Sequence, residues 1–336
     1  MTTRREFLAG LGAAAAGAVA ARPRTAAAFR PAAPVKARVV VVRDDALAAD
    51  SPAPEKVRAL LDAAAQALEG VGKAGDAWAA SFKPDDRVGI KVNCLGLPTR
   101  PAVALGLAEA LAAAEVAPDR VLIWDRFNRE LRAAGHDLRT SGRGVRCYGT
   151  DALGARGSGG YAPDVATSGQ IGSLYSRIVT DETTALVSAA VLKDHNLAGL
   201  TGVLKNFYGA IHNPNKYHMN GCDPFIADVC AHANVRGRLR LAVCDAGRPQ
   251  YNGGPPARPP WQWPYGGLIL SRDPVAADRV AAEILDRKRR AAGLKSLQED
   301  GRPVRYLASA EARGLGTADL ARIEVIGIGK PWLDVG

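Results

Sequence analysis

The chain has 336 residues and a formal net charge of +10, with 36 Gly and 21 Pro. This length is sufficient for one large domain with a full hydrophobic core, and the glycines and prolines are too dispersed to indicate a disordered protein. The Lys and Arg residues are also dispersed and do not alternate with aromatic side chains. We therefore expect no nucleic-acid partner, and we interpret the positive charge as solubility and attraction of anionic ligands.

Residues 1–28 have the pattern of a twin-arginine signal peptide. Arg4-Arg5 is followed by Phe7-Leu8, then by a small-residue apolar run from Ala9 to Ala21, and the segment ends in alanines that suit signal peptidase. The run is too short to span a hydrocarbon core of about 30 Å, so we expect no stable membrane span after cleavage. The twin-arginine export machinery moves folded proteins. The sequence predicts a periplasmic or otherwise extracytoplasmic protein, exported folded, with residues 29–336 as its single α/β domain.

Short β-branched runs then alternate with longer amphipathic stretches rich in Ala and Leu. This alternation predicts the α/β class: a mostly parallel sheet with helices on both faces, in a single large domain. The expected strands are 37–43, 87–92, 120–124, 145–148, 185–192, 239–244, 268–271 and 323–326. The expected helices are 54–68, 101–114, 128–134, 224–234 and 274–291. Several of them begin with Pro in the first turn, where the missing N–H costs nothing.

Polar residues follow four of the predicted strands. They are Asn93, Asp125, the run Lys193-Asp194-His195, and Asp245. Asp and Asn are also ordinary turn residues, so any one of these positions has a purely structural interpretation. Because ligands bind outside the carboxyl ends of parallel strands, the four positions together indicate one site at that edge of the sheet.

The segment from residue 193 to residue 218 contains three of the five histidines and has two interpretations. In the first, His195, His212 and His218 bind a transition metal, with Asp125 or Asp245 as a further ligand, because imidazole and carboxylate suit such ions. A metal inserted before export would also explain export in the folded state. The histidine spacing matches neither H-E-x-x-H nor H-x-x-x-H, so it gives only a weak signal for a metal and leaves its presence and identity open.

In the second interpretation, Lys193, Lys205 and Lys216 form a cationic pocket for a carboxylate or phosphate. Backbone N–H groups near Gly199 and Gly202 would complete it. The spacing differs from that of a P-loop, so it does not indicate a nucleotide. The five cysteines lie outside any C-x-x-C spacing and give no iron–sulfur cluster motif.

The segment 251–265 carries two glycines, five prolines and two tryptophans. It is either a lid that closes over a pocket, with Trp261 or Trp263 as the apolar wall, or a stiff loop whose tryptophans pack on the body of the domain.

Several of these motifs together resemble the family catalogued as domain of unknown function 362, over roughly residues 85–285. The residues that carry the resemblance are Lys91-x-Asn93, Lys193-x-His195, Thr201-Gly202-x-x-Lys205-Asn206-x-x-Gly209, Lys216-x-His218, Asp245, Gly253-Gly254-Pro255 and Asp273-Pro274-Val275-Ala276-x-Asp278.

The resemblance implies an α/β domain in which these polar residues form the common site, and it implies no particular reaction. Some relatives carry a ferredoxin-like cysteine segment, which this sequence lacks. The sequence also departs from the family's Pro-Lys-x-Lys-x-His pattern, since it reads Leu192-Lys193-Asp194-His195. The acidic Asp194, in place of a basic residue, weakens the case for a purely anion-binding role and slightly strengthens the case for a metal or acid–base role.

The hypothesis is therefore an exported enzyme of unassigned reaction, redox or hydrolytic if it is metal-dependent, that acts on an anionic small molecule. The alternative is a non-catalytic exported protein that binds a metal or an anion. The expected catalytic residues are Lys193, His195, Lys205, Asn206 and His218. The expected substrate-binding residues are Lys91, Asn93, Thr201, Gly202, Lys216 and Asp245.

Overall fold

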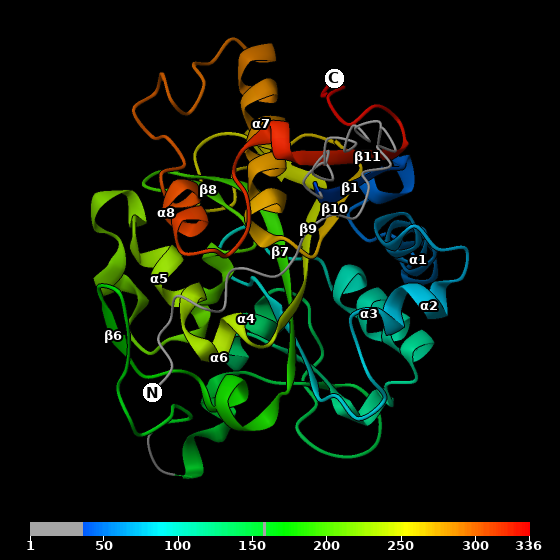
Figure 1. The fold of residues 1–336 in the computed structure, drawn as a ribbon, viewed down its shortest axis with the longest axis vertical. Coiled ribbons are helices and arrows are strands. Elements are labelled where there is room, and N and C mark those ends of the chain that lie inside the picture. The colour runs from blue at the N-terminus through cyan, green and yellow to red at the C-terminus, as the bar shows by residue number, and fades with distance from the viewer. Residues whose placement is uncertain (1–35, 157–158) are drawn as a thin grey trace, which may run out of the picture. The chain divides into compact units, whose positions relative to one another are not determined.

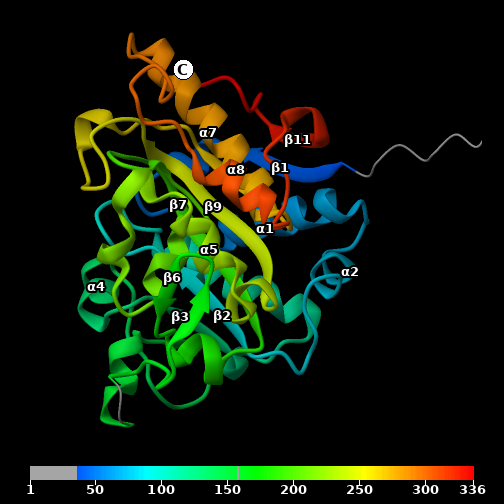
Figure 2. The same cartoon turned by 60° about the vertical axis from the view of Figure 1, so that its left-hand side comes forward.

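The structure, a computed structural model, describes residues 36–156 and 159–336. The predicted signal peptide, residues 1–28, lies outside the described residues. The fold class predicted from the sequence is confirmed, because a nine-stranded, mostly parallel sheet with helices on both faces dominates the described part of the chain (Figures 1 and 2).

The large sheet has the strand order β11-β1-β10-β9-β7-β2-β3-β4, with β8 paired to the end of β7. Within the described part of this sheet, only β10 and β8 run antiparallel to their neighbours. The strand bounds are β1 Ala37–Arg43, β2 Val88–Val92, β3 Val121–Trp124, β4 Arg146–Cys147, β7 Ala185–His195, β8 Gly199–Thr201, β9 Leu239–Gln250, β10 Gly267–Ser271 and β11 Ile323–Gly329. A separate hairpin consists of β5 Ala166–Ser168 and β6 Ile171–Ser173.

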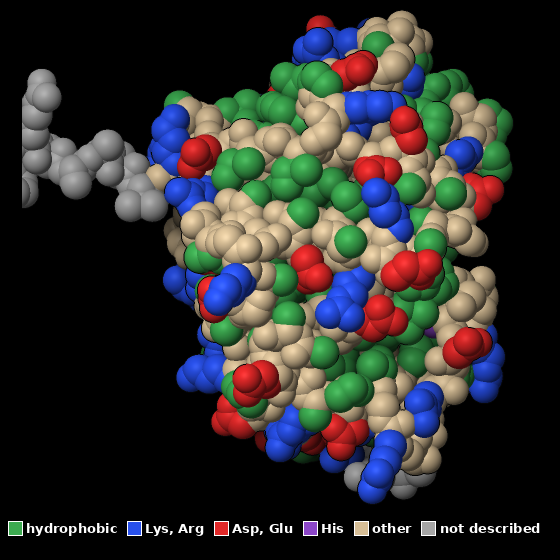
Figure 3. Space-filling view, turned by 90° about the vertical axis from the view of Figure 1, so that its right-hand side faces the viewer, with side chains coloured by type: hydrophobic (Ala, Val, Ile, Leu, Met, Phe, Trp, Pro, Cys, Tyr) green, Lys and Arg blue, Asp and Glu red, His purple; other side chains and the backbone are tan. Residues whose placement is uncertain are grey.

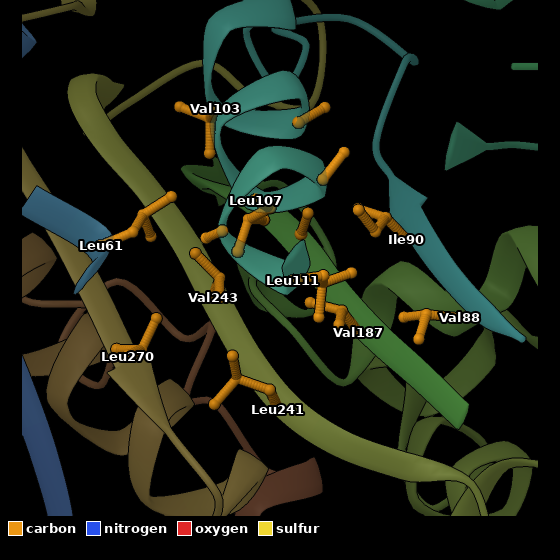
Figure 4. Close-up of a cluster of buried hydrophobic side chains, with 14 of the residues drawn as sticks. Leu61, Val88, Ile90, Val103, Leu107, Leu111, Val187, Leu241, Val243 and Leu270 are labelled. Carbon is orange, nitrogen blue, oxygen red and sulfur yellow. The ribbon is translucent and has the colours of Figure 1, made fainter. Parts of the chain in front are cut away.

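Helices cover both faces of the sheet. Their bounds are α1 Pro54–Glu69, α2 Ala74–Ala79, α3 Pro101–Ala110, α4 Asn128–Ala133, α5 Phe225–Ala231, α6 Ala233–Arg236, α7 Pro274–Ala291 and α8 Tyr306–Ala312. Side chains of α1 and α3, such as Leu61 and Leu107, pack on Ile90, Val187 and strands next to them on one face (Figure 4). On the other face, α7 packs against β1, β7, β9 and β10, and α5 packs against α8.

Local sequence signals set the ends of the long helices. The side chain of Asp273 accepts hydrogen bonds from the backbone N–H groups of Val275 and Ala276, and Pro274 occupies the first turn of α7. Helix α1 ends at Gly70, whose φ of 71° is left-handed and favours glycine.

The predicted elements differ from the observed ones mainly at their ends. Strands β7 and β9 continue to His195 and Gln250, beyond the apolar runs from which they were predicted, because β7 pairs with β8 and β9 stays paired with β7 as far as Gln250. The predicted helix 224–234 is divided into α5 and α6 at His232, whose extended ψ of 140° breaks the helix. The short helices α2 and α8 were not predicted.

No helix in the described ranges is long and apolar enough to cross a membrane. On the face of the molecule shown in Figure 3, Lys and Arg side chains are interspersed with Asp and Glu. That face shows no continuous patch of one charge.

A buried carboxylate on α7 anchors the segment that leads into the site. Asp278 is fully buried, and it accepts hydrogen bonds from the backbone N–H groups of Val203 and Leu204 at 2.7 and 3.1 Å. The hydroxyl of Tyr306 donates to the same carboxylate at 3.1 Å. Burial raises the pKa of Asp278 to about 7. A Cβ at Gly202 would overlap this carboxylate, so only glycine fits there.

We expect Gly202→Ala to lower the free energy of unfolding by about 1–3 kcal/mol, because overpacking must displace Asp278 or the chain. Urea denaturation measures the effect. Gly327→Ala is the matched control, since a Cβ there meets no atom within 4 Å. Equal stability of the two variants would contradict the close-approach explanation.

Candidate functional site

A cavity of about 170 Å³ opens at the carboxyl edge of the sheet, where β2, β3 and β7 end. The 3₁₀ helix η6 (Lys205–Ala210) and the segment that follows it form the opposite wall. Most of the predicted site residues line this cavity: Lys91, Asn93, Lys193, His195, Thr201, Lys205, Asn206 and His218. The sheet edge thus brings together residues that are more than a hundred positions apart in the sequence.

Lys91, at the end of β2, is a fully coordinated buried cation. Its ammonium donates to the carbonyl of Val92 at 2.6 Å, to Asp125 Oδ1 at 2.6 Å and to Asn206 Oδ1 at 3.2 Å. The amide of Asn206 donates in return to the Lys91 carbonyl at 2.7 Å. All three ammonium N–H groups are therefore occupied, and Lys91 has no donor left for a ligand.

Lys193, near the end of β7, is also saturated. Its ammonium donates to Asn93 Oδ1 at 2.8 Å and to the carbonyls of Leu95 and Leu97 at 2.5 and 2.8 Å. Burial, followed by the charge of Lys205, lowers the pKa of Lys193 to about 7. Lys193 thus holds the loop after β2 in place, and it contributes positive charge to the cavity rather than a free donor.

Lys205 differs from the other two lysines. Within the described residues its only hydrogen bond is to His218 Nε2 at 3.3 Å, and its ammonium lies 4.4 Å from the centre of the Tyr208 ring. Neither Lys205 nor Lys193 forms an ion pair with a carboxylate in the described ranges. Burial lowers the pKa of Lys205 to about 8. Lys205 is therefore the buried cation that keeps N–H groups for a ligand.

His218 presents an unprotonated nitrogen to Lys205. Its Nδ1 lies 3.0 Å from the carbonyl of Pro214, and only a protonated Nδ1 makes a hydrogen bond to that acceptor. The neutral ring then carries its lone pair on Nε2, which faces the Lys205 ammonium. Burial and the neighbouring charge of Lys205 both lower the pKa of His218, so the neutral form is favoured.

His195 has the opposite tautomer. Its Nδ1 accepts hydrogen bonds from the backbone N–H groups of Leu197 and Ala198 at 3.1 and 3.2 Å, within the β7–β8 turn. Burial, then the charge of Lys205, lowers the pKa of His195 to about 2. The ring is therefore neutral near pH 7 and carries its proton on Nε2. It lines the cavity as a hydrogen-bond donor.

Strand pairing explains which side chains of β7 reach the cavity. Lys193 pairs with Thr201 of β8, and Lys193 and His195 share one side of the strand, because successive residues alternate. Asp194 points the other way, where it lies 2.7 Å from Arg302. The hydroxyl of Thr201 is buried in the cavity wall without a hydrogen-bond partner among the described atoms.

The cavity residues that were not predicted as site residues include Arg126, Glu130 and Tyr208. Arg126 lies just after β3, Glu130 lies on α4, and Tyr208 lies on η6. Burial, then the charge of Asp125, raises the pKa of Glu130. The position of Asp125 at a strand end was the available signal for the first two, because the chain turns there into α4.

Four predicted site residues lie outside this cavity. Gly202 packs against Asp278, and Lys216 is exposed with its ammonium 5.7 Å from the centre of the Tyr217 ring. Asp245 is buried in an ion pair with Arg100 at 2.6 Å, because β9 continues past it and its carboxylate faces a neighbouring loop. The structure therefore does not bring these three residues to the cavity.

His212 is the fourth, and the structure does not bring it into the cavity with His195 and His218. It is exposed and packs edge-on against Tyr161 at 5.0 Å between ring centres, away from His195 and His218. Those two rings stack at 5.9 Å, but the Nδ1 atoms of both are engaged by backbone groups. The described residues contain no cluster of three or more His, Cys, Asp or Glu that could hold a metal ion.

Neither Trp261 nor Trp263 is among the described residues that line the cavity at Lys205. Trp263 is buried against Tyr251 and Tyr265 on the body of the domain. The turn Gly253-Gly254-Pro255 lines the site instead, with Pro255 at the cavity. All five cysteines are buried and unpaired.

A family model described as "Domain of unknown function (DUF362)" matches residues 88–283. The chain belongs to this family. The matched range extends from β2 into α7, so it contains every side chain of the cavity, and it confirms the resemblance inferred from the motifs. Comparisons with curated proteins and with solved structures give no match.

The buried charge of Lys205 predicts a pH-dependent stability difference. An unfolded lysine has a pKa of 10.5, and that of folded Lys205 is about 8, so burial of the ammonium opposes folding fully below pH 8. Between these two values the penalty declines, and above pH 10.5 it is absent. We expect Lys205→Met to raise the free energy of unfolding by a few kcal/mol near pH 7 and by progressively less as the pH approaches 10.

Urea denaturation of both proteins across this pH range tests the expectation. Lys216→Met, at an exposed position outside the cavity, is the control and should change stability little at any pH. A Lys205→Met variant that is less stable than wild type near pH 7 would contradict the assignment of Lys205 as an unpaired buried cation.

Proposed function

We propose that this protein is an enzyme that binds an anionic small molecule at Lys205 and transfers a proton between that molecule and the Lys205–His218 pair. The observation that carries the proposal is the environment of Lys205: a buried ammonium with no carboxylate partner in the described ranges and with donors directed at a cavity. An unpaired buried charge opposes folding, so a ligand that supplies the counter-charge is its simplest explanation.

The anion would bind where positive potential is highest. Lys193 adds positive charge at the cavity wall while its own donors remain occupied, and Lys205 supplies the direct contacts. The low dielectric of a buried site strengthens this attraction compared with water. Both a carboxylate and a phosphate carry the negative charge and the acceptor oxygens that Lys205 would bind.

His218 and Lys205 are suited to proton transfer. The lone pair of His218 Nε2 accepts from the Lys205 ammonium, and the pKa of Lys205, about 8, lies close to neutral pH. General acid–base catalysis is most effective when the catalytic pKa is near the operating pH. In this role Lys205 gives a proton to the substrate or takes one from it, and His218 shares that proton.

His195 and Thr201 would orient the substrate. His195 offers a neutral Nε2–H, which stabilises an oxygen that develops negative charge without adding another cation to the site. The buried Thr201 hydroxyl has no hydrogen-bond partner among the described atoms and can bind a ligand oxygen. Both would therefore gain a partner when an oxygen-rich anion enters.

This proposal does not involve a metal. A metal at His195 Nε2 needs a proton on Nδ1, and that proton would oppose the N–H groups of Leu197 and Ala198. Elemental analysis of the purified protein tests this point. A stoichiometric transition metal that is lost in His195→Gln would contradict the tautomer assigned here and support metal-dependent chemistry instead.

The alternative is a non-catalytic exported protein that binds an anion. The saturated hydrogen bonding of Lys91 and Lys193 favours it, because the cavity walls are fixed before a ligand arrives. A binding protein and an enzyme differ in whether the ligand leaves unchanged.

We expect small carboxylates or phosphates to raise the melting temperature of wild type and of Lys216→Met, but not of Lys205→Met. In mass spectrometry of anionic metabolite pools incubated with the protein, we expect wild type and His212→Gln to deplete a component, and His218→Gln to bind it without depleting it. Depletion by His218→Gln would contradict the proton-transfer role. Recovery of all ligands unchanged from wild type would support the binding protein.

We also propose that the twin-arginine machinery exports the folded chain to the periplasm or an equivalent compartment, on the basis of Arg4-Arg5 and the apolar run after it. Replacing both arginines by lysine should leave an uncleaved precursor in the cytoplasm, as followed by cell fractionation. The control replaces Arg22 and Arg24 by lysine and should be exported normally. Normal export of the first variant would contradict the proposal.

A further inference from the structure

The cavity at Lys205 shares a wall with a second, larger cavity. The inner cavity has a volume of about 170 Å³ and the outer one about 560 Å³. His195, His218 and Pro255 line both. Ligand pockets in proteins usually measure about 300–1,000 Å³, so the inner cavity holds only the head of an ordinary ligand. The remainder of such a ligand would lie in the outer cavity.

The one carboxylate of the outer cavity is already neutralised. Asp194 is buried and lies 2.7 Å from Arg302 and 3.8 Å from Arg289, and it accepts a hydrogen bond from the backbone N–H of Gly254 at 3.0 Å. Arg302 is in turn shared with Asp300 at 2.6 Å. Because both carboxylates are paired with arginine side chains, they do not attract a cationic group of a ligand.

Arg258 is the unpaired cation of the outer cavity. Its guanidinium makes no hydrogen bond or ion pair with any described residue, and it lines the cavity at an exposed position. Its backbone is nevertheless fixed, because its N–H donates to Gln250 Oε1 at 2.7 Å. The fully buried Gln250 also donates from Nε2 to the carbonyl of Pro256 at 2.9 Å. The backbone that carries this guanidinium is thus fixed at the wall of the outer cavity.

We propose that the ligand is an elongated molecule with an anionic group at each end, one at Lys205 in the inner cavity and the other at Arg258 in the outer cavity. The segment between the two groups passes the stacked rings of His195 and His218. This inference rests on the proposed function, because it extends the anion site at Lys205 to a second contact.

An amphiphilic anion with an apolar tail is the competing ligand class. Leu197 lines the outer cavity and is 45% exposed, so an apolar tail has one contact there. The two classes predict opposite preferences. A second anionic group gains from Arg258, whereas an apolar end loses nothing when Arg258 is removed.

The experiment is isothermal titration of the purified mature protein with monocarboxylates, α,ω-dicarboxylates and ω-phosphonocarboxylates of increasing chain length. The variants are Lys205→Met, Arg258→Met and the matched control Arg240→Met, an exposed arginine at the opposite end of β9. Once the chain is long enough to reach from Lys205 to Arg258, we expect wild type to bind the dianions about fivefold more tightly than monocarboxylates of the same length. Arg258→Met should abolish this preference, and Arg240→Met should retain it. Comparison of the phosphonocarboxylates with the dicarboxylates shows whether the inner cavity prefers a phosphonate or a carboxylate group.

Equal affinity for mono- and dianions at every length, or a dianion preference that survives in Arg258→Met, overturns this inference. If monocarboxylates still bind and Lys205→Met removes that binding, the proposed function stands while the inference fails. If neither class binds, or if Lys205→Met binds both as wild type does, the proposed function and the inference both fail.

Discussion

The site depends on the buried ion pair between Lys91 and Asp125. This pair connects β2 to the end of β3, and Asn206 adds η6 to it. The second carboxylate oxygen of Asp125 accepts from the backbone N–H of Cys94 at 2.8 Å, which fixes the start of the loop after β2. A Cβ at Gly209 would lie 2.7 Å from the Lys91 ammonium, so the helix packs directly on the pair. Buried ion pairs often add little stability, but removing one partner leaves an uncompensated charge and costs about 3–5 kcal/mol. The pair therefore specifies the geometry of the site.

The carboxyl edge of the sheet carries more positive than negative charge. His195 and His218 are neutral there, so they add nothing to this positive charge. Lys91 has a carboxylate partner, whereas Lys193 and Lys205 have only neutral partners in the described ranges. The same burial that lowers the pKa values of the two unpaired lysines keeps His195 and His218 uncharged. Unpaired buried charge of this kind lowers the stability of the folded protein, a feature that is common at active sites.

Sequence patterns predicted the fold well because burial is periodic in both kinds of element. The β-branched strands and the Pro-initiated helices of the large sheet lie within a few residues of their predicted positions. The polar ends of β7 and β9 were missed, because Lys193 to His195 and most residues from Asp245 to Gln250 are buried through strand pairing and not through an apolar sequence pattern. The short helices α2 and α8 have few turns and too little periodicity to be recognised.

The sequence alone determined the fold class, the family and the edge of the sheet where Lys91, Lys193, His195 and Lys205 meet. Those conclusions depend on periodicity and on motif spacing, which the linear chain carries in full. Tertiary structure decided which of these groups is free for a ligand, because the saturation of a lysine depends on carbonyls and amides contributed by distant loops. It also separated His212 from the other two histidines. Hydrogen-bond partners are set by packing, and packing is not a local property of the sequence.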